Sequence, residues 1–326
     1  MIKHALVQLM EVTGLSSISR YIYRNRPIIL MYHRILEHPL VPGVSPALFD
    51  KQLAYLKSHF RVIPINQLVE EIKRDQVQPN SVAITFDDGH QDFYTNAWPL
   101  LQAHQLPASI YVATGFIDNQ CWLWPDLLRY QLMNTNLDSL NLPELRSLSL
   151  ARPDLLKTWA TLADYCLQME PDARQLFLEQ VGIKLDATAP QAPLPPFDPL
   201  TWAQLREMNR AGLDVGSHTV SHPILSGLSK ESLEQELADS YERILHELGH
   251  PPSGMCYPNG MARDVSPFVE QYSAGLYQYG LVAYPATVKK ENIMHLGRWG
   301  GASTFSRFKQ IMNGTTRNDN VRGEYR

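Results

Sequence analysis

The chain has 326 residues and a mass of 37.1 kDa, with 44% hydrophobic and 19% charged residues, which excludes a disordered or collagen-like protein. With 29 Lys and Arg against 33 Asp and Glu, the formal net charge is −4. We therefore expect no nucleic-acid partner, because such proteins present a basic face. The length fits two domains or one large domain with an insertion.

Cysteine usage and the absence of targeting signals predict a cytoplasmic protein. The three cysteines are widely spaced and form no Cys-x-x-Cys pair, a pattern typical of a reducing compartment. The N-terminus has no uninterrupted apolar run before Glu11 and no small-residue cleavage site, so we expect no cleaved signal peptide. No stretch approaches the ~18 consecutive apolar residues of a transmembrane helix.

Residues 2–22 predict an amphipathic helix, with apolar residues such as Ile2, Leu6 and Leu9 at helical spacing. One interpretation is a helix docked on the body of the protein. The other is a peripheral contact with the inner face of a membrane, although the basic flank that favours such contacts is thin.

Residues 27–310 alternate between short apolar runs and helical segments. A helix should begin after Ser45, followed by helices over residues 67–74 and 230–248. Alternating strands and helices predict a parallel sheet that is closed, or nearly closed, into a barrel. The seven predicted strands are residues 27–32, 61–65, 81–86, 108–113, 212–216, 254–257 and 280–284.

Residues 118–200 interrupt this alternation between the fourth and fifth strands. They predict helices over residues 125–133, 143–169 and 171–181, followed by a Pro-rich linker over 189–196. We interpret the segment as a helical insertion in one domain over residues 27–310, with residues 311–326 as a C-terminal tail.

The third predicted strand ends in Thr85-Phe86-Asp87-Asp88-Gly89. Asp-Gly by itself is a common turn signal, and a simple turn is the alternative interpretation. Two adjacent carboxylates that leave a buried strand have diverging side chains. One of them is then able to bind a metal while the other stays free as a base.

The fifth predicted strand ends in a segment that carries His218 and His222. Histidines four residues apart share a face if the segment turns helically, although an unrelated surface pair is the alternative. The Glu of a His-Glu-x-x-His protease motif is absent. One carboxylate and two imidazoles form a three-ligand set that suits a catalytic Zn²⁺, and Asp87 is left as a base beside it.

These segments resemble the two strongest motifs of the polysaccharide deacetylases, the NodB-like carbohydrate esterases. The resemblance extends to residues 30–34, 107–112 and 256–260 and covers about 27–117 and 200–310. It implies a distorted (β/α) barrel of about seven parallel strands and metal-dependent removal of N-acetyl groups from amino sugars of an exopolysaccharide, a lipopolysaccharide or another envelope glycan or its lipid-linked precursor. It further implies that Asp88, His218 and His222 bind a divalent metal, for which Zn²⁺ is our preferred ion, and that Asp87 is the general base.

The resemblance also places the substrate and the oxyanion at the loop of Tyr257, Pro258 and Asn259. An amide leaving group needs a general acid, for which we prefer His33 at the end of the first strand over His295. Many family members carry an arginine at the position of Cys256 that pairs with the catalytic aspartate. Arg298 is our candidate to replace that charge at the site, with a surface salt bridge as the alternative.

Three other functions remain open. A deformylase or an O-acetyl esterase acting on a related sugar would use the same metal chemistry. A glycan-binding protein on a decayed catalytic scaffold is the third, and it predicts that a metal ligand or the base is missing.

Overall fold

The computed structural model describes residues 15–315 of the chain. Most of the helix predicted over residues 2–22 lies outside the described residues, and the part inside them belongs to α2, Leu15–Tyr23. Helix α2 exposes Ile18, Tyr21 and Ile22. Among residues 15–315, no helix combines the length and apolarity that crossing a bilayer requires.

Within the described residues, one eight-stranded sheet forms the centre of the fold, with every strand pairing parallel. The strand order is β10-β1-β3-β4-β7-β8-β9, and β2 pairs with β3 outside this path. The strands are β1 Ile28–Tyr32, β2 Arg61–Val62, β3 Ser81–Phe86, β4 Ser109–Val112, β7 Asp214–Ser217, β8 Gly254–Cys256, β9 Tyr279–Leu281 and β10 Trp299–Gly300.

The segment over residues 296–300 joins the two ends of this curled sheet. Leu296 forms a parallel bridge with Leu281 of β9, and three residues later Trp299 of β10 pairs with Leu30 of β1. The prediction of a distorted barrel is therefore confirmed, with an eighth strand, β10, that the sequence pattern did not reveal.

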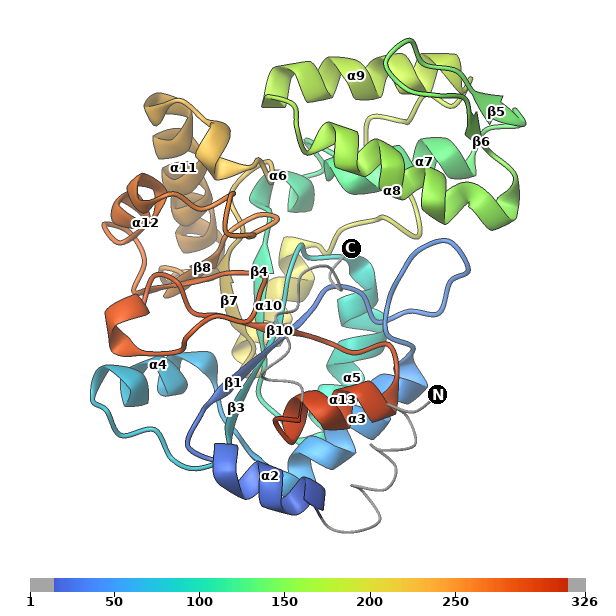
Figure 1. Cartoon of the computed structure of the whole chain (residues 1–326). Helices are drawn as coiled ribbons and strands as arrows, with labels where there is room; N and C mark the ends of the chain where they lie inside the picture. Colours follow the sequence, from blue (N-terminus) through green and yellow to red (C-terminus); the bar gives the residue numbers. More distant parts are fainter. Residues whose placement is uncertain (1–14, 316–326) are drawn as a thin grey trace.

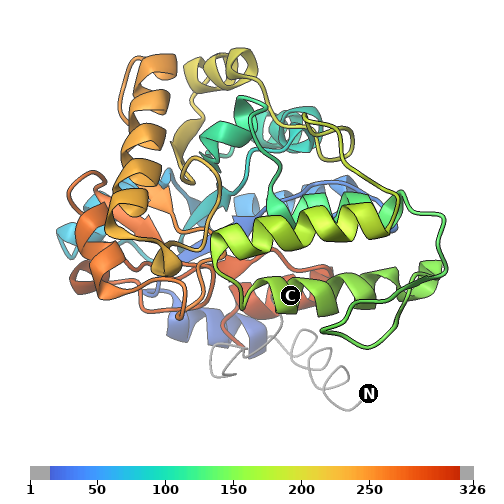
Figure 2. The ribbon, with the colours of Figure 1, turned by 90° about the horizontal axis from the view of Figure 1, so that it is seen from above.

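Helices surround the sheet, as Figures 1 and 2 show. Helix α3 begins after Ser45, whose side chain accepts a hydrogen bond from the Leu48 amide, and α11 ends at Gly249 in the left-handed conformation, with φ of 77°. Both ends agree with the prediction. Besides α2, the α-helices described outside the insertion are α3 Pro46–His59, α4 Ile65–Lys73, α5 Trp98–His104, α6 Thr114–Ile117, α10 Trp202–Arg210, α11 Lys230–Leu248, α12 Pro267–Ser273 and α13 Phe305–Met312.

An aromatic cluster lies beneath the C-terminal end of β3. Phe86 is fully buried and packs edge-to-face on Phe93 at a centroid distance of 4.7 Å. It also stacks on Tyr32 at 5.3 Å. Because this cluster fixes the last residue of the strand, it also fixes where the two carboxylates that follow leave the sheet.

The insertion packs as a separate group of elements at the top of Figure 1. It has its own cluster of buried side chains, which includes Leu128, Leu162, Leu178 and Val181. Its elements are α7 Trp124–Met133, the antiparallel pair β5 Ser139–Leu140 and β6 Leu148–Ser149, α8 Leu155–Cys166 and α9 Pro171–Lys184.

Two element predictions were wrong, and proline explains both. The helix expected over residues 143–169 begins only at Leu155, because Pro153 has no amide hydrogen to donate within a longer helix. The strand expected over residues 61–65 is limited to Arg61–Val62, since Pro64 precedes the first residue of α4. At the other end, α13 runs to Met312, and residues 316–326 of the expected tail lie outside the described residues.

Candidate active site

The C-terminal ends of β1, β3, β7 and β8 meet at one cavity of about 940 Å³. Helices α7 and α8 of the insertion contribute its opposite wall, which includes Trp124, Trp159 and Ala163. Of the residues named in the sequence analysis, His33, Asp87, Asp88, His218, His222, Tyr257 and Asn259 line this cavity, whereas Pro258 and Arg298 are not among its lining residues.

Asp87 is buried at the base of the cavity and forms an ion pair with Arg298. The two guanidinium nitrogens Nη1 and Nη2 each donate to one carboxylate oxygen at 2.7 Å. Arg298 is fully buried, which excludes a surface salt bridge. Its Nη2 also lies 2.8 Å from Sγ of Cys256, so arginine and cysteine together enclose the carboxylate of Asp87.

The arginine sets the protonation state of this carboxylate. Burial by itself would raise the pKa of Asp87, but the charge of Arg298 and its hydrogen bonds outweigh burial and hold the pKa below its usual value. Asp87 is therefore ionised at neutral pH and able to accept a proton.

Asp88 turns the other way and faces the two histidines. Its Oδ1 lies 3.5 Å from Nε2 of His218 and 3.7 Å from Nε2 of His222. Ligand atoms of all three side chains lie within 4.8 Å of one another, and all three residues are buried.

The orientation of His218 indicates a cation between these groups. Its Nδ1 lies 2.7 Å from the backbone carbonyl oxygen of Cys256, which only accepts hydrogen bonds, so Nδ1 carries the proton. In the neutral ring, Nε2 then points a lone pair at the carboxylate of Asp88. Two lone pairs at 3.5 Å repel each other unless a positive charge lies between them. Without a metal ion that charge is a proton, because burial is outweighed by the nearby negative charges and the hydrogen bond to Asp88, which raise the pKa of His218 well above its usual value. A bound metal ion takes the place of this proton. The donor set therefore fits a divalent metal ion.

Burial, together with the nearby His218, lowers the pKa of His222 to about 4. The imidazole of His222 is neutral at pH 7, which is the form that binds metals.

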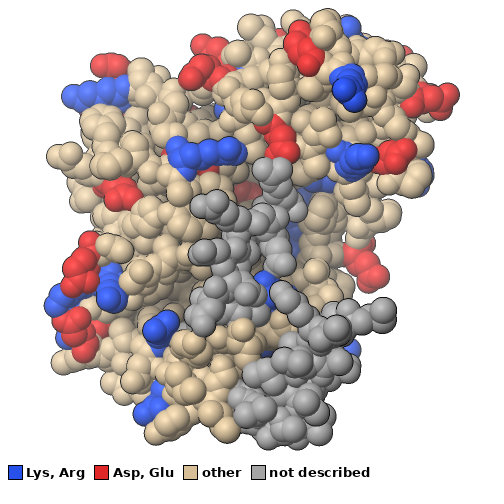
Figure 3. All heavy atoms as spheres, in the orientation of Figure 1, with Lys and Arg blue, Asp and Glu red and all other residues tan. Residues whose placement is uncertain are grey.

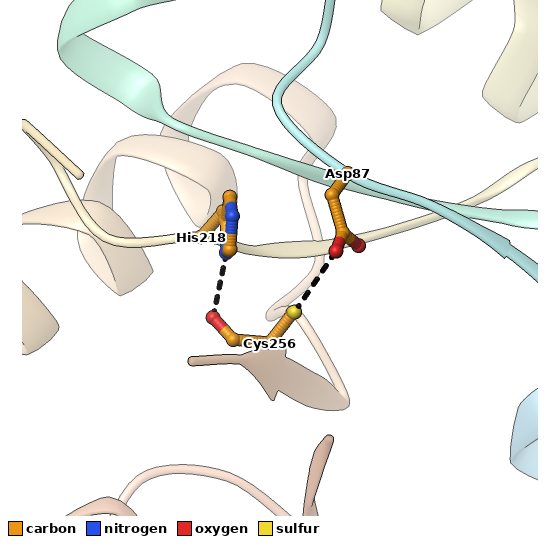
Figure 4. Close-up of side chains that lie close together, drawn as sticks. All are labelled: Asp87, His218 and Cys256. Carbon is orange, nitrogen blue, oxygen red and sulfur yellow. Dashed lines mark hydrogen bonds between the residues drawn. The ribbon is translucent and has the colours of Figure 1, made fainter. Parts of the chain in front are cut away.

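A second group with metal-binding spacing consists of Asp87, His218 and Cys256, and Figure 4 shows these three side chains. In this group, Nδ1 of His218 already donates to the Cys256 carbonyl. Both oxygens of Asp87 are bound to the positive charge of Arg298, which would repel a cation. The set of Asp88, His218 and His222 is therefore the better metal site.

The two histidines converge through a turn and not through a helix. Thr219 and His222 have positive φ angles of 69° and 60°, which are uncommon outside glycine and strained for the β-branched threonine. Glu236 of α11 holds the turn, because its Oε2 accepts hydrogen bonds from the amides of Val220 at 2.8 Å and Ser221 at 3.0 Å. Sequence reasoning missed Glu236, since nothing distinguishes it from the other acidic residues of an amphipathic helix.

The two candidate acids lie in different surroundings. Nε2 of His33 is 3.8 Å from Oδ2 of Asp87, and the side chain is 44% exposed. His295 does not line the cavity, and both of its ring nitrogens have partners, Glu270 and the hydroxyl of Tyr284. This geometry favours His33 over His295.

The loop expected to contact the oxyanion follows β8. The amide of Tyr257 donates to the Leu281 carbonyl at 3.1 Å, and the amide of Gly260 donates to Pro258. Asn259 lines the cavity and its amide has no backbone partner within the described residues. Of the backbone amides in residues 257–260, that of Asn259 is the one without a backbone acceptor among the described residues, which makes it our candidate to meet a negative charge in the cavity.

Comparison with known proteins identifies sequence relatives of the chain. A family model described as polysaccharide deacetylase matches residues 74–275, which is more than half of the chain. A poly-β-1,6-N-acetyl-D-glucosamine N-deacetylase of Staphylococcus aureus (strain MSSA476) is 30% identical over 79 residues. That match covers 24% of this chain and spans about a quarter (27%) of the curated relative.

Two solved structures share the fold over most of the chain. Streptococcus pyogenes deacetylase PplD, in complex with acetate, has a TM-score of 0.60 at 20% identity and is matched over 88% of this chain and 97% of its own. IcaB from Ammonifex degensii has a TM-score of 0.59 at 16% identity, over 88% and 96%. At these identities the likeness shows the fold alone. The extent of the family-model match establishes that the chain belongs to the polysaccharide deacetylase family.

Proposed function

We propose that the protein is a metal-dependent hydrolase that removes N-acetyl groups from the amino sugars of a glycan. The observation that carries this proposal is the pair of adjacent carboxylates with separate partners. Asp88 faces two histidines, whereas Asp87 is held ionised by Arg298. A binding protein without catalytic function has no need for this division.

The proposed reaction begins with attack of a water molecule on the acetyl carbonyl carbon. Asp87 accepts a proton from this water. General-base catalysis of this kind accelerates a reaction by ~10²–10⁴-fold. The amide of Asn259 donates to the oxygen that becomes negative. Arg298 keeps Asp87 in the form that accepts a proton.

The carbon–nitrogen bond then breaks. An amine leaves only after its nitrogen is protonated, and His33 is the proposed donor because its Nε2 reaches the cavity beside Asp87. The products are acetate and a free amino sugar.

Asp88, His218 and His222 would hold the metal, and Zn²⁺ suits their donor set of one carboxylate and two imidazoles. When bound, such an ion supplies a Lewis acid for the acetyl carbonyl and for the attacking water.

The substrate that we propose is an N-acetylated glycan of the cell envelope or its precursor, with poly-β-1,6-N-acetyl-D-glucosamine as the first polymer to test because the sequence relative is named for it. A cytoplasmic location and a membrane contact through residues 2–22 remain predictions.

On the face of the molecule that Figure 3 shows, basic and acidic side chains are intermixed.

The experiment is acetate release by the purified protein from a panel of N-acetyl, N-formyl and O-acetyl sugars. We expect release from the N-acetyl substrates, loss on chelation, and loss in the His218→Ala variant. Preferred release of formate, or of acetate from esters only, would assign the deformylase or esterase function instead. No release from any substrate by the metal-loaded protein would contradict a hydrolase.

A further inference from the structure

The helical insertion places a carboxylate next to the metal-binding end of the barrel. Asp126 lies in the first turn of α7, and its Oδ2 is 2.6 Å from Nε2 of His90, which follows the Asp87-Asp88-Gly89 turn. His90 is 2% exposed. A contact this short and this buried holds the insertion to the turn that carries both catalytic carboxylates.

The other nitrogen of His90 points to the proposed metal ligand Asp88. Nδ1 of His90 lies 3.8 Å from Oδ2 of Asp88, is buried, and has no hydrogen-bond partner within residues 15–315. The opposite oxygen, Oδ1, faces His218 and His222. Asp88 therefore presents one oxygen to the metal-binding histidines and the other to His90.

The ring of His90 has little freedom to leave this position. It packs edge-to-face on Phe116 at a centroid distance of 5.1 Å. The backbone around it is tied to the end of the insertion, because the Gln91 amide donates to the Asp198 carbonyl and the Leu200 amide donates to the Gly89 carbonyl. With ring and backbone fixed, rotation of the Asp88 carboxylate brings Oδ2 toward Nδ1. Both carboxylates accept from His90 when each ring nitrogen carries a hydrogen, with Nε2 donating to Asp126 and Nδ1 to Asp88.

We propose that His90 and Asp126 are positioning residues for the metal site. Asp126 holds the ring of His90, and His90 orients the carboxylate of Asp88 so that Oδ1 stays directed at the two histidines. The inference rests on the proposed metal site, and it makes the insertion a functional part of that site. Partners of metal ligands commonly contribute about 10–100-fold to metal affinity.

The alternative is that Asp126 only attaches the insertion to the barrel. In that case, loss of any other contact that attaches the insertion should weaken metal binding to the same extent. Arg129 lies on the same helix and also joins the insertion to the barrel segment, because its Nη1 donates to the Leu40 carbonyl at 2.8 Å. It packs over Trp159 at 4.0 Å, and no hydrogen bond between it and His90 is present among the described residues. Arg129→Met is therefore a matched control that loosens docking and leaves the hydrogen bond between Asp126 and His90 in place, while removing one positive charge near Asp126.

The test is the dissociation constant for Zn²⁺, measured on the chelator-stripped full chain by competition with a chromophoric chelator. The variants are Asp126→Ala, Asp126→Asn, Arg129→Met and His218→Ala, each with the Tm of its metal-free form. We expect Asp126→Ala to bind Zn²⁺ about 10-fold or more weakly. Asp126→Asn should lose less, because its amide oxygen still accepts a hydrogen bond from His90, and Arg129→Met should bind as the original chain does.

Each other outcome has a definite meaning. Unchanged affinity in Asp126→Ala, with binding lost in His218→Ala, overturns the inference and leaves the metal site standing. Equal weakening in Asp126→Ala and Arg129→Met reduces Asp126 to a docking residue. Full affinity in His218→Ala overturns the metal site itself and the inference with it. If Asp126→Ala does not fold, His90→Gln replaces it, with the same expectation of weaker binding.

Discussion

The guanidinium of Arg298 donates two parallel hydrogen bonds of 2.7 Å to the carboxylate of Asp87, although 211 residues separate them in the chain. Arg298 reaches this position from the segment that joins β9 to β1. The side chain of Cys256 lies against both partners. The positive charge beside the proposed base therefore comes from the residue that directly precedes β10.

Replacing Arg298 by methionine should strongly destabilise the fold. Both partners are almost fully buried, and removal of one leaves an uncompensated buried charge, which costs about 3–5 kcal/mol. Chemical denaturation of the metal-free protein measures the loss. Addition of Asp87→Asn in the same chain should restore part of this stability, because the buried charge is then gone. A loss below about 1 kcal/mol, as for an exposed pair, would show that the ion pair does not form.

The pH dependence of hydrolysis should also respond to this arginine. With Arg298 in place, the pKa of Asp87 is held below its usual value, so the base is ionised over most of the accessible range. In Arg298→Met, burial acts without the opposing charge and raises the pKa. The acid limb of the kcat/KM profile should therefore move to higher pH in the folded fraction of the variant. An unchanged acid limb would mean that Asp87 does not govern it.

Removal of the proposed general acid should depend on the leaving group. His33→Ala should lower kcat on an N-acetyl sugar about 10²-fold or more, because the amine must be protonated as it leaves. An activated aryl acetate, whose leaving group needs no proton, should be hydrolysed almost as fast as before.

His295→Ala provides the control for this experiment, since His295 lies outside the cavity and is bound to Glu270 and Tyr284. We expect wild-type rates from it on both substrates. Equal loss on the amide and on the aryl acetate in His33→Ala would assign His33 a role other than the acid.

The wall that α8 contributes to the cavity should affect binding of large substrates. Ala160 lines the cavity and is only partly exposed, so Ala160→Trp should fill part of the space and raise KM for an oligosaccharide several-fold. Hydrolysis of a small aryl acetate should change little. Ala173→Trp, at an exposed position of α9 away from the cavity, is the matched control, and equal effects of the two variants would contradict a substrate site along α8.

The parts of the site that sequence reasoning located are those that follow a buried strand directly. Asp87 and Asp88 are the two residues after β3, and His218 directly follows β7. Because the C-terminal ends of the strands of a parallel barrel meet at one end of it, the sequence alone was sufficient to predict that these side chains lie close together. The barrel itself followed from the alternation of apolar runs and helices.

The parts that were missed depend on contacts far apart in the chain. Strand β10 has only two residues, too few for any periodicity, and it is recognisable only by its pairing with β1. Asp126 lies in the first turn of α7. An acidic residue is common there simply because it interacts favourably with the partial positive charge of the helix N-terminus. Its contact with His90 arises from the packing of the insertion on the barrel, which local sequence does not encode.

The most direct test of the central claim is a crystal structure of the protein soaked with Zn²⁺, with the ion located by its anomalous scattering. We expect one ion bound by Asp88, His218 and His222, with Asp87 uncoordinated and still paired with Arg298. An ion held by Asp87, His218 and Cys256, or no ion near these residues at saturating Zn²⁺, would contradict the division of roles between the two aspartates.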